Sequence, residues 1–182
     1  LESVHAGTIS GKVVCRSAGD DCAGVVFAES VPQQKVSPAN GPVILDQTNL
    51  TFIPHLLPIV VGTTVTFPNN DTVPHNVFSS SPAKLFNLGM YPKGASRQVT
   101  FDKPGEVHLL CNIHPDMSAY ILVLEEPYFA LTAKDGSFRL EGLPPGKYTL
   151  TAWHERFKPV SRGTEIKQEE NTHLKLELVD AR

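Results

Sequence analysis

The sequence predicts an all-β protein built from two small sandwiches. Fifteen prolines and thirteen glycines separate short runs rich in Val, Thr, Phe and Leu, and helical periodicity is nearly absent. Short strands at regular spacing, with turn signals between them, are typical of β-sandwiches. Within one such run, alternation places Val61, Val65 and Phe67 on the same face of a strand.

The expected strands follow in chain order from these patterns. Valine-rich runs predict the first two, Thr8–Cys15 and Gly24–Glu29. In the middle of the chain, β-branched and aromatic residues between turns predict Val43–Asp46, Leu50–Phe52, Ile59–Phe67, Asn76–Phe78, Ser96–Phe101, Gly105–Leu110 and Ser118–Leu124. Toward the end, a hairpin signal at Asp135-Gly136 and a Pro-Pro-Gly turn predict Phe129–Ala133, Ser137–Glu141, Lys147–Trp153, Gly163–Lys167 and Thr172–Leu178.

Two seams divide the chain into domains. A polar, Pro-rich stretch over 31–42 and the pair Glu126-Pro127 isolate residues 37–126, which are enough for one small sandwich. The flanks, 1–36 and 127–182, are each too short to bury a good core alone. We therefore expect them to join into a second, discontinuous sandwich. The alternative is an N-terminal hairpin that extends the sheet of the central domain.

Composition excludes some classes of partner. The net charge of −3 is too weak to suggest a nucleic-acid-binding protein, and the sequence has no Lys/Arg cluster. No apolar run approaches the roughly 20 residues of a membrane helix, so we expect no membrane span. No feature of the sequence requires more than a monomer.

The three cysteines divide unevenly. Cys15 and Cys22 bracket a polar turn and have valines nearby, which predicts a disulfide between neighbouring strands. Such a bond indicates the periplasm or the exterior; the alternative is two unpaired small residues. Cys111 is left over, and a bound metal explains an odd cysteine in a secreted protein.

Three further candidate metal ligands accompany that cysteine. Cys111, His114 and Met117 lie within seven residues, and His75 comes from a separate strand-like segment. Two His and one Cys with a weak axial Met are typical of blue-copper sites, whose soft sulfur ligands suit Cu(I) while imidazole suits both oxidation states. Structural zinc usually takes four Cys or His ligands, and a catalytic Cys–His pair needs an oriented base. The pattern therefore predicts one copper ion that cycles between Cu(I) and Cu(II).

Two motifs resemble the cupredoxins of the amicyanin and plastocyanin type. They are Cys111-Asn-Ile-His114-Pro115-Asp-Met117 and the run from Gly62-Thr-Thr-Val-Thr-Phe67 to Pro74-His75-Asn76-Val77. The resemblance covers about 37–126. It implies a Greek-key sandwich in which His75, Cys111 and His114 are equatorial ligands and Met117 is axial.

The resemblance also implies supporting roles near the ligands. Asn76 is expected to tie the two ligand-bearing loops together, and Pro115 to stiffen the ligand loop by removing a backbone donor. Alternatively, Asn76 is a turn residue and Pro115 only ends a strand.

His55 could lie near the metal as an extra ligand, or could be an ordinary surface histidine. His108 is three residues before Cys111, so it faces the other side of the strand.

The flanking sequence resembles a second family. The segments Asp135-Gly136-Ser-Phe138 and Leu143-Pro-Pro-Gly146-Lys-Tyr148 are similar to carboxypeptidase-regulatory-like sandwiches of the transthyretin type. This resemblance implies an accessory scaffold rather than chemistry.

These observations predict a periplasmic or secreted copper protein that moves electrons and is not an enzyme. The cupredoxin resemblance implies transient partners such as c-type cytochromes or a dehydrogenase. Two alternatives remain open: a copper chaperone or storage module, and an accessory copper subunit of an oxidoreductase.

Overall fold

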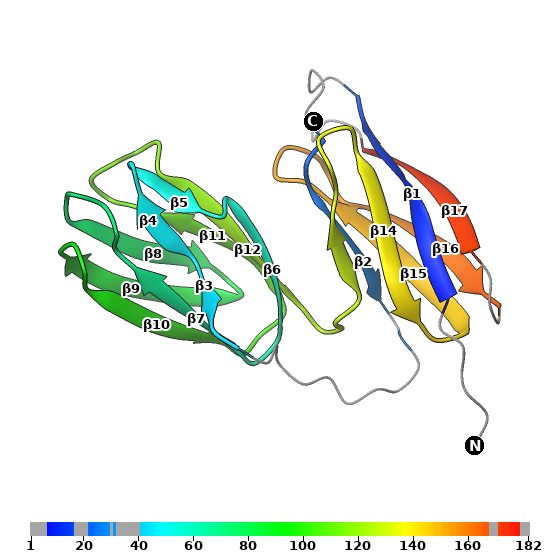
Figure 1. Cartoon of the computed structure of the whole chain (residues 1–182), viewed down its shortest axis with the longest axis horizontal. Helices are drawn as coiled ribbons and strands as arrows, with labels where there is room; N and C mark the ends of the chain where they lie inside the picture. Colours follow the sequence, from blue (N-terminus) through cyan, green and yellow to red (C-terminus); the bar gives the residue numbers. More distant parts are fainter. Residues whose placement is uncertain (1–6, 17–21, 30, 32–40, 168–170, 179–182) are drawn as a thin grey trace. The chain divides into compact units, whose positions relative to one another are not determined.

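The computed structural model describes residues 7–16, 22–29, 31, 41–167 and 171–178. These residues form strands and turns, which confirms the all-β fold. Among them, no helix of the length and apolarity that a membrane span needs is present. The chain divides into two compact units, Leu1–Lys35 with Tyr128–Arg182, and Val36–Pro127 (Figure 1). Each bound lies one residue from the one expected.

The unit Val36–Pro127 is a sandwich of two main sheets. The larger has the order β6 (Leu56–Val60), β12 (Ser118–Leu124), β11 (Gly105–Leu110), β8 (His75–Ser81) and β9 (Lys84–Tyr91). The smaller has the order β10 (Ser96–Phe101), β7 (Thr63–Pro68) and β3 (Val43–Ile44), beside a hairpin of β4 (Asp46–Thr48) and β5 (Thr51–Ile53). Inward-facing residues of both sheets form one core, which includes Val65, Phe67, Phe101, Val107, Leu109 and Ile121.

Three expectations for this unit are wrong. The expected strand Ile59–Phe67 is two strands, because a turn at Gly62, with φ of 87°, separates β6 in one sheet from β7 in the other. Val43–Asp46 is likewise interrupted at Leu45, and Leu50 belongs to the β4–β5 turn rather than to a strand. Strand β9 was not expected at all.

The other unit is also a sandwich, and both ends of the chain build it. One sheet has the order β14 (Ser137–Leu143), β1 (Gly7–Cys15) and β17 (Asn171–Leu178). The other has the order β13 (Phe129–Leu131), β2 (Val25–Glu29), β15 (Gly146–Trp153) and β16 (Val160–Ile166). Strand β1 lies between β14 and β17 (Figure 1), so the N-terminal strands complete this sandwich and do not extend the sheet of the central unit.

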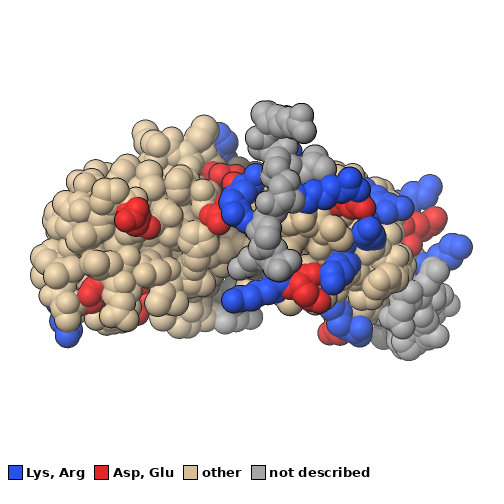
Figure 2. Space-filling view, turned by 90° about the horizontal axis from the view of Figure 1, so that it is seen from above, with Lys and Arg blue, Asp and Glu red and all other residues tan. Residues whose placement is uncertain are grey.

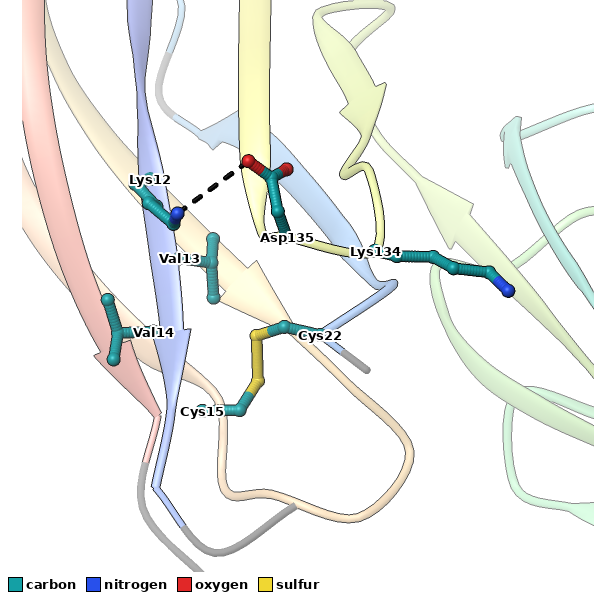
Figure 3. Close-up of a pocket in the computed structure, with 7 residues that line it drawn as sticks. All are labelled: Lys12, Val13, Val14, Cys15, Cys22, Lys134 and Asp135. Atoms are coloured by element: carbon teal, nitrogen blue, oxygen red, sulfur yellow. Dashed lines mark ion pairs between the residues drawn. A yellow bond between two sulfur atoms is a disulfide. The ribbon is translucent and has the colours of Figure 1, made fainter. Parts of the chain in front are cut away.

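The expected disulfide between Cys15 and Cys22 is present, with 5.7 Å between the Cα atoms. The expectation that it joins neighbouring strands is wrong, because β1 and β2 belong to different sheets. The bond instead links the end of β1 to the segment that leads into β2, and so connects the two layers of the sandwich. Figure 3 shows it beside the ion pair of Lys12 and Asp135.

Gly136, in the turn before β14, has no room for a side chain. Its φ is 82°, and an added Cβ would lie 1.9 Å from the carbonyl oxygen of Val13. We predict that Gly136→Ala lowers the free energy of unfolding by at least about 3 kcal/mol, since both backbone strain and a clash must be relieved. Gly142→Ala is the matched control, because its φ is 76° but nothing lies within 4 Å. We expect Gly142→Ala to lower the free energy of unfolding by about 1 kcal/mol. Equal losses for the two variants in denaturant unfolding would contradict the clash at Gly136.

Candidate metal centre

Strand β11 delivers Cys111 to the core side of the sandwich. Alternation along the strand places Val107, Leu109 and Cys111 in the same buried cluster. His108 faces the other side, where its ring stacks on Tyr120 with 4.5 Å between centroids. The structure therefore excludes His108 from the site, as expected from strand geometry.

Two imidazoles approach Cys111 from different segments. His75 is the first residue of β8 and is fully buried. His114 is half-buried in the turn between β11 and β12, and this turn is closed by a hydrogen bond from the Met117 N–H to the His114 carbonyl. The strands thus fix His75 and Cys111, while a tight turn presents His114.

The donor atoms of these three residues converge. Nδ1 of His75 lies 3.0 Å from Nδ1 of His114, and Sγ of Cys111 lies 3.8 Å from the same His114 atom. All three donor atoms lie within 4.8 Å of one another. These separations are short enough for one metal ion to contact two nitrogens and one thiolate.

The remaining residues of the ligand loop differ in exposure. Met117 is only 1% exposed and belongs to the same core cluster as Cys111. Pro115 is exposed at the tip of the turn.

Asn76 connects the two segments that carry the ligands. Its side-chain oxygen accepts a hydrogen bond of 3.1 Å from the N–H of Asn112, next to Cys111. Its amide nitrogen donates one of 2.8 Å to Asn87 on β9. Asn76 is 1% exposed, and hydrogen bonds made by a buried side chain hold a loop in one position.

His55 lies outside the group of converging donors. It is exposed, and its Nδ1 lies 3.1 Å from the carbonyl oxygen of Ser118. Its ring also contacts Tyr120 edge-on, with 5.8 Å between centroids. The structure therefore places His55 beside β12 and not among the candidate ligands.

The sequence did not identify Asp71. Its Oδ2 accepts a hydrogen bond of 2.9 Å from Nε2 of His75 and one of 2.7 Å from the N–H of Leu50. These bonds, that from Leu50 foremost, hold the pKa of Asp71 well below its usual range. The one feature of the sequence that could have indicated Asp71 is its position, four residues before the candidate ligand His75.

A buried polar network supports the loop between β7 and β8. The amide of Asn69 donates to the carbonyls of Val73 and Tyr91, each at 3.0 Å. Gln47 donates to the hydroxyl of Tyr91 at 2.6 Å, and burial raises the pKa of that hydroxyl to about 12. Because Tyr91 pairs with His75 across β8 and β9, the network fixes the backbone that carries a candidate ligand.

Comparison with known families agrees with this arrangement. Residues 39–124 match the family described as copper binding proteins of the plastocyanin/azurin family. Residues 118–179 match the carboxypeptidase regulatory-like domain. Both resemblances expected from the sequence are confirmed, each for its own part of the chain. The unit Val36–Pro127 is therefore a cupredoxin-type domain, and copper is its cofactor.

Several solved structures are similar to part of the chain. A copper-containing nitrite reductase from Thermus scotoductus SA-01 is 30% identical, with 54% of this chain and 25% of that chain covered and a TM-score of 0.45. A purple cupredoxin from Nitrosopumilus maritimus is 29% identical, with 47% and 100% covered and a TM-score of 0.41. A reduced mutant of amicyanin is 25% identical, with 54% and 98% covered and a TM-score of 0.44. The chain thus spans a quarter of the nitrite reductase. No curated protein matches the chain significantly.

The residues present fit copper on their own chemistry. Two imidazole Nδ1 atoms and a buried free thiol point at one another, and a buried thioether follows three residues after His114. This mixture of soft sulfur and imidazole donors suits copper in both oxidation states.

Proposed function

We propose that this chain carries single electrons between larger redox proteins and catalyses no reaction by itself. Its bound copper supplies a one-electron couple, Cu(I)/Cu(II), held by His75, Cys111, His114 and Met117. The observation that supports this most directly is the convergence of three donor atoms within 4.8 Å in a site held by strands. The thiolate and thioether suit the reduced ion, and the imidazoles suit both states.

The protein keeps these donors in one arrangement. His75 and Cys111 are anchored by β8 and β11, and Asn76 bridges the two segments. A site fixed in this way changes little when the metal changes charge, and this keeps the reorganisation that accompanies electron transfer small.

Electrons enter and leave near His114. Of the three converging residues only His114 is partly exposed. Three exposed apolar side chains belong to residues near the candidate ligands: Ile113 (47%) precedes His114, Val73 (36%) is two residues before His75, and Met90 (48%) pairs with Asn76. Lys, Arg, Asp and Glu are sparse on the face of this unit that Figure 2 shows. Exposed apolar side chains near the ligands suit a small, transient redox interface, for which we propose a c-type cytochrome or a dehydrogenase.

The disulfide supports a location outside the cytoplasm. Bonds such as Cys15–Cys22 persist in oxidising compartments. We therefore propose that the protein works in the periplasm or is secreted.

Stopped-flow mixing of the copper protein with a reduced c-type cytochrome tests this function. We expect a reversible one-electron couple, and a rate that falls about tenfold in Ile113→Lys, because 1.4 kcal/mol of docking energy is a factor of ten. The control is Leu85→Lys, because Leu85 is also exposed (78%) but lies far from the site. It pairs with Ser80 on β8, and Ser80 is about 17 Å along that strand from His75. Rapid transfer of copper to an acceptor, without a stable redox couple, would instead favour a copper-handling role.

A further inference from the structure

We propose that Asp71 is a positioning residue, which fixes the tautomer of His75 and favours oxidised over reduced copper. The inference rests on the proposed copper function. Asp71 lies on the side of the His75 ring opposite the other candidate ligands. The His75 side chain is 0% exposed and that of Asp71 is 7% exposed, with 2.9 Å between Nε2 and Oδ2.

The contact decides which nitrogen of His75 carries a proton. A carboxylate only accepts hydrogen bonds, so the His75 nitrogen that faces it must be the N–H. In the neutral ring this leaves Nδ1 as a lone pair, and Nδ1 is the atom that lies 3.0 Å from His114. Asp71 thereby directs the metal-binding lone pair of His75 toward the site.

Asp71 is itself held from several directions. Its Oδ2 also accepts from the N–H of Leu50 at 2.7 Å, and its Oδ1 accepts from the N–H of Thr72 at 2.6 Å. Its own N–H donates to Asn69 at 2.9 Å. A carboxylate with this many bonds cannot turn away without leaving the buried N–H of His75 and the partly buried N–H groups of Leu50 and Thr72 unsatisfied.

The bond from Leu50 depends on an unusual turn. Asn49 and Leu50 both have left-handed backbone conformations, with φ of 52° and 57°, in the turn between β4 and β5. Asn70 strengthens the connection, because its N–H donates to the Gln47 carbonyl at 3.0 Å and its side chain to Asp46 at 3.0 Å. The β4–β5 hairpin thus sets the position of the carboxylate behind His75.

A fixed negative charge beside a ligand has a redox consequence. A hydrogen-bonded carboxylate makes the imidazole a stronger donor, and its charge stabilises Cu(II) more than Cu(I), since the two ions differ by one charge. Asp71 is therefore expected to raise Cu(II) affinity more than Cu(I) affinity.

Asp71→Asn keeps the shape and removes the charge. We expect Cu(II) affinity to fall 10- to 100-fold, the usual range for partners of ligands. If the fall in Cu(I) affinity is about ten times smaller than the fall in Cu(II) affinity, the reduction potential rises by about 59 mV, since this is the equivalent of a factor of ten for one electron. Asp116→Asn is the matched control, because Asp116 is an exposed carboxylate two residues after His114. Equal shifts in the two variants, or no shift in Asp71→Asn, would overturn the proposal.

A measurement on the metal-free wild-type protein separates this inference from copper binding itself. Nitrogen-15 NMR of the histidine rings should show His75 with its proton on Nε2. A proton on Nδ1 would overturn the proposal, whether or not the chain binds copper and whether or not Asp71→Asn folds. Failure to bind copper with the Nε2 proton in place would instead count against the proposed function.

Discussion

Copper-loaded Cys111→Ser is expected to show none of the intense visible absorption that we predict for the copper-loaded wild-type protein. That absorption is charge transfer from a thiolate to Cu(II), and Cys111 is the one free cysteine among the described residues. A hydroxyl is also a poor ligand for Cu(I), which prefers soft sulfur donors. We therefore expect Cu(I) affinity to fall by more than about 100-fold, beyond the loss typical of a residue that only supports a ligand.

The neighbouring position provides the control for this variant. Asn112 is exposed and offers the site only its backbone N–H, which Asn112→Ser preserves. Its visible band should equal that of the wild type. Thermal unfolding of both metal-free variants would show whether the fold is retained, and a band that survives in folded Cys111→Ser would exclude Cys111 as the thiolate ligand.

Removal of His75 is expected to cause a large loss of copper affinity as well. His75→Ala deletes a candidate ligand that is fully buried, and it leaves Asp71 without one of its donors. We expect Cu(II) affinity to fall by more than about 100-fold. The metal-free protein should lose about 1–3 kcal/mol of stability, the usual cost of an unsatisfied buried partner.

His55→Ala is the matched control for this loss. His55 is exposed and bonds to the carbonyl of Ser118, so its removal should change the spectrum and the potential little and stability by less than about 0.5 kcal/mol. Competition against a copper chelator, followed by absorption, measures both affinities. Equal losses of Cu(II) affinity in His75→Ala and His55→Ala would contradict the assignment of His75 as a ligand.

The sequence predicted the parts of the site that depend on local spacing. Cys111, His114 and Met117 lie within one turn between two alternating strands, so their proximity follows from chain order. Alternation also predicted that His108 faces away from Cys111. These relations hold whatever the rest of the fold does.

Relations between distant segments could not be predicted in this way. Strand β9 contains Asn87 and Gly89, which are unfavourable in strands, and its pairing with β8 is what makes it a strand. Asp71 reaches its place because a turn 21 residues earlier presents the N–H of Leu50. The pairing of Cys15 with Cys22 was predicted, but the sequence did not show that the two strands beside it belong to different sheets. In each case the partner is set by tertiary packing.

We propose that His75, Cys111, His114 and Met117 form one copper electron-transfer site. Its most direct test is a copper titration of the full chain, followed by visible absorption and by quantification of bound metal. We expect saturation at one copper ion per chain, with an intense band that disappears on reduction and returns on oxidation. Cu(II) that binds without colour, or a chain that binds no copper when folded, would contradict it.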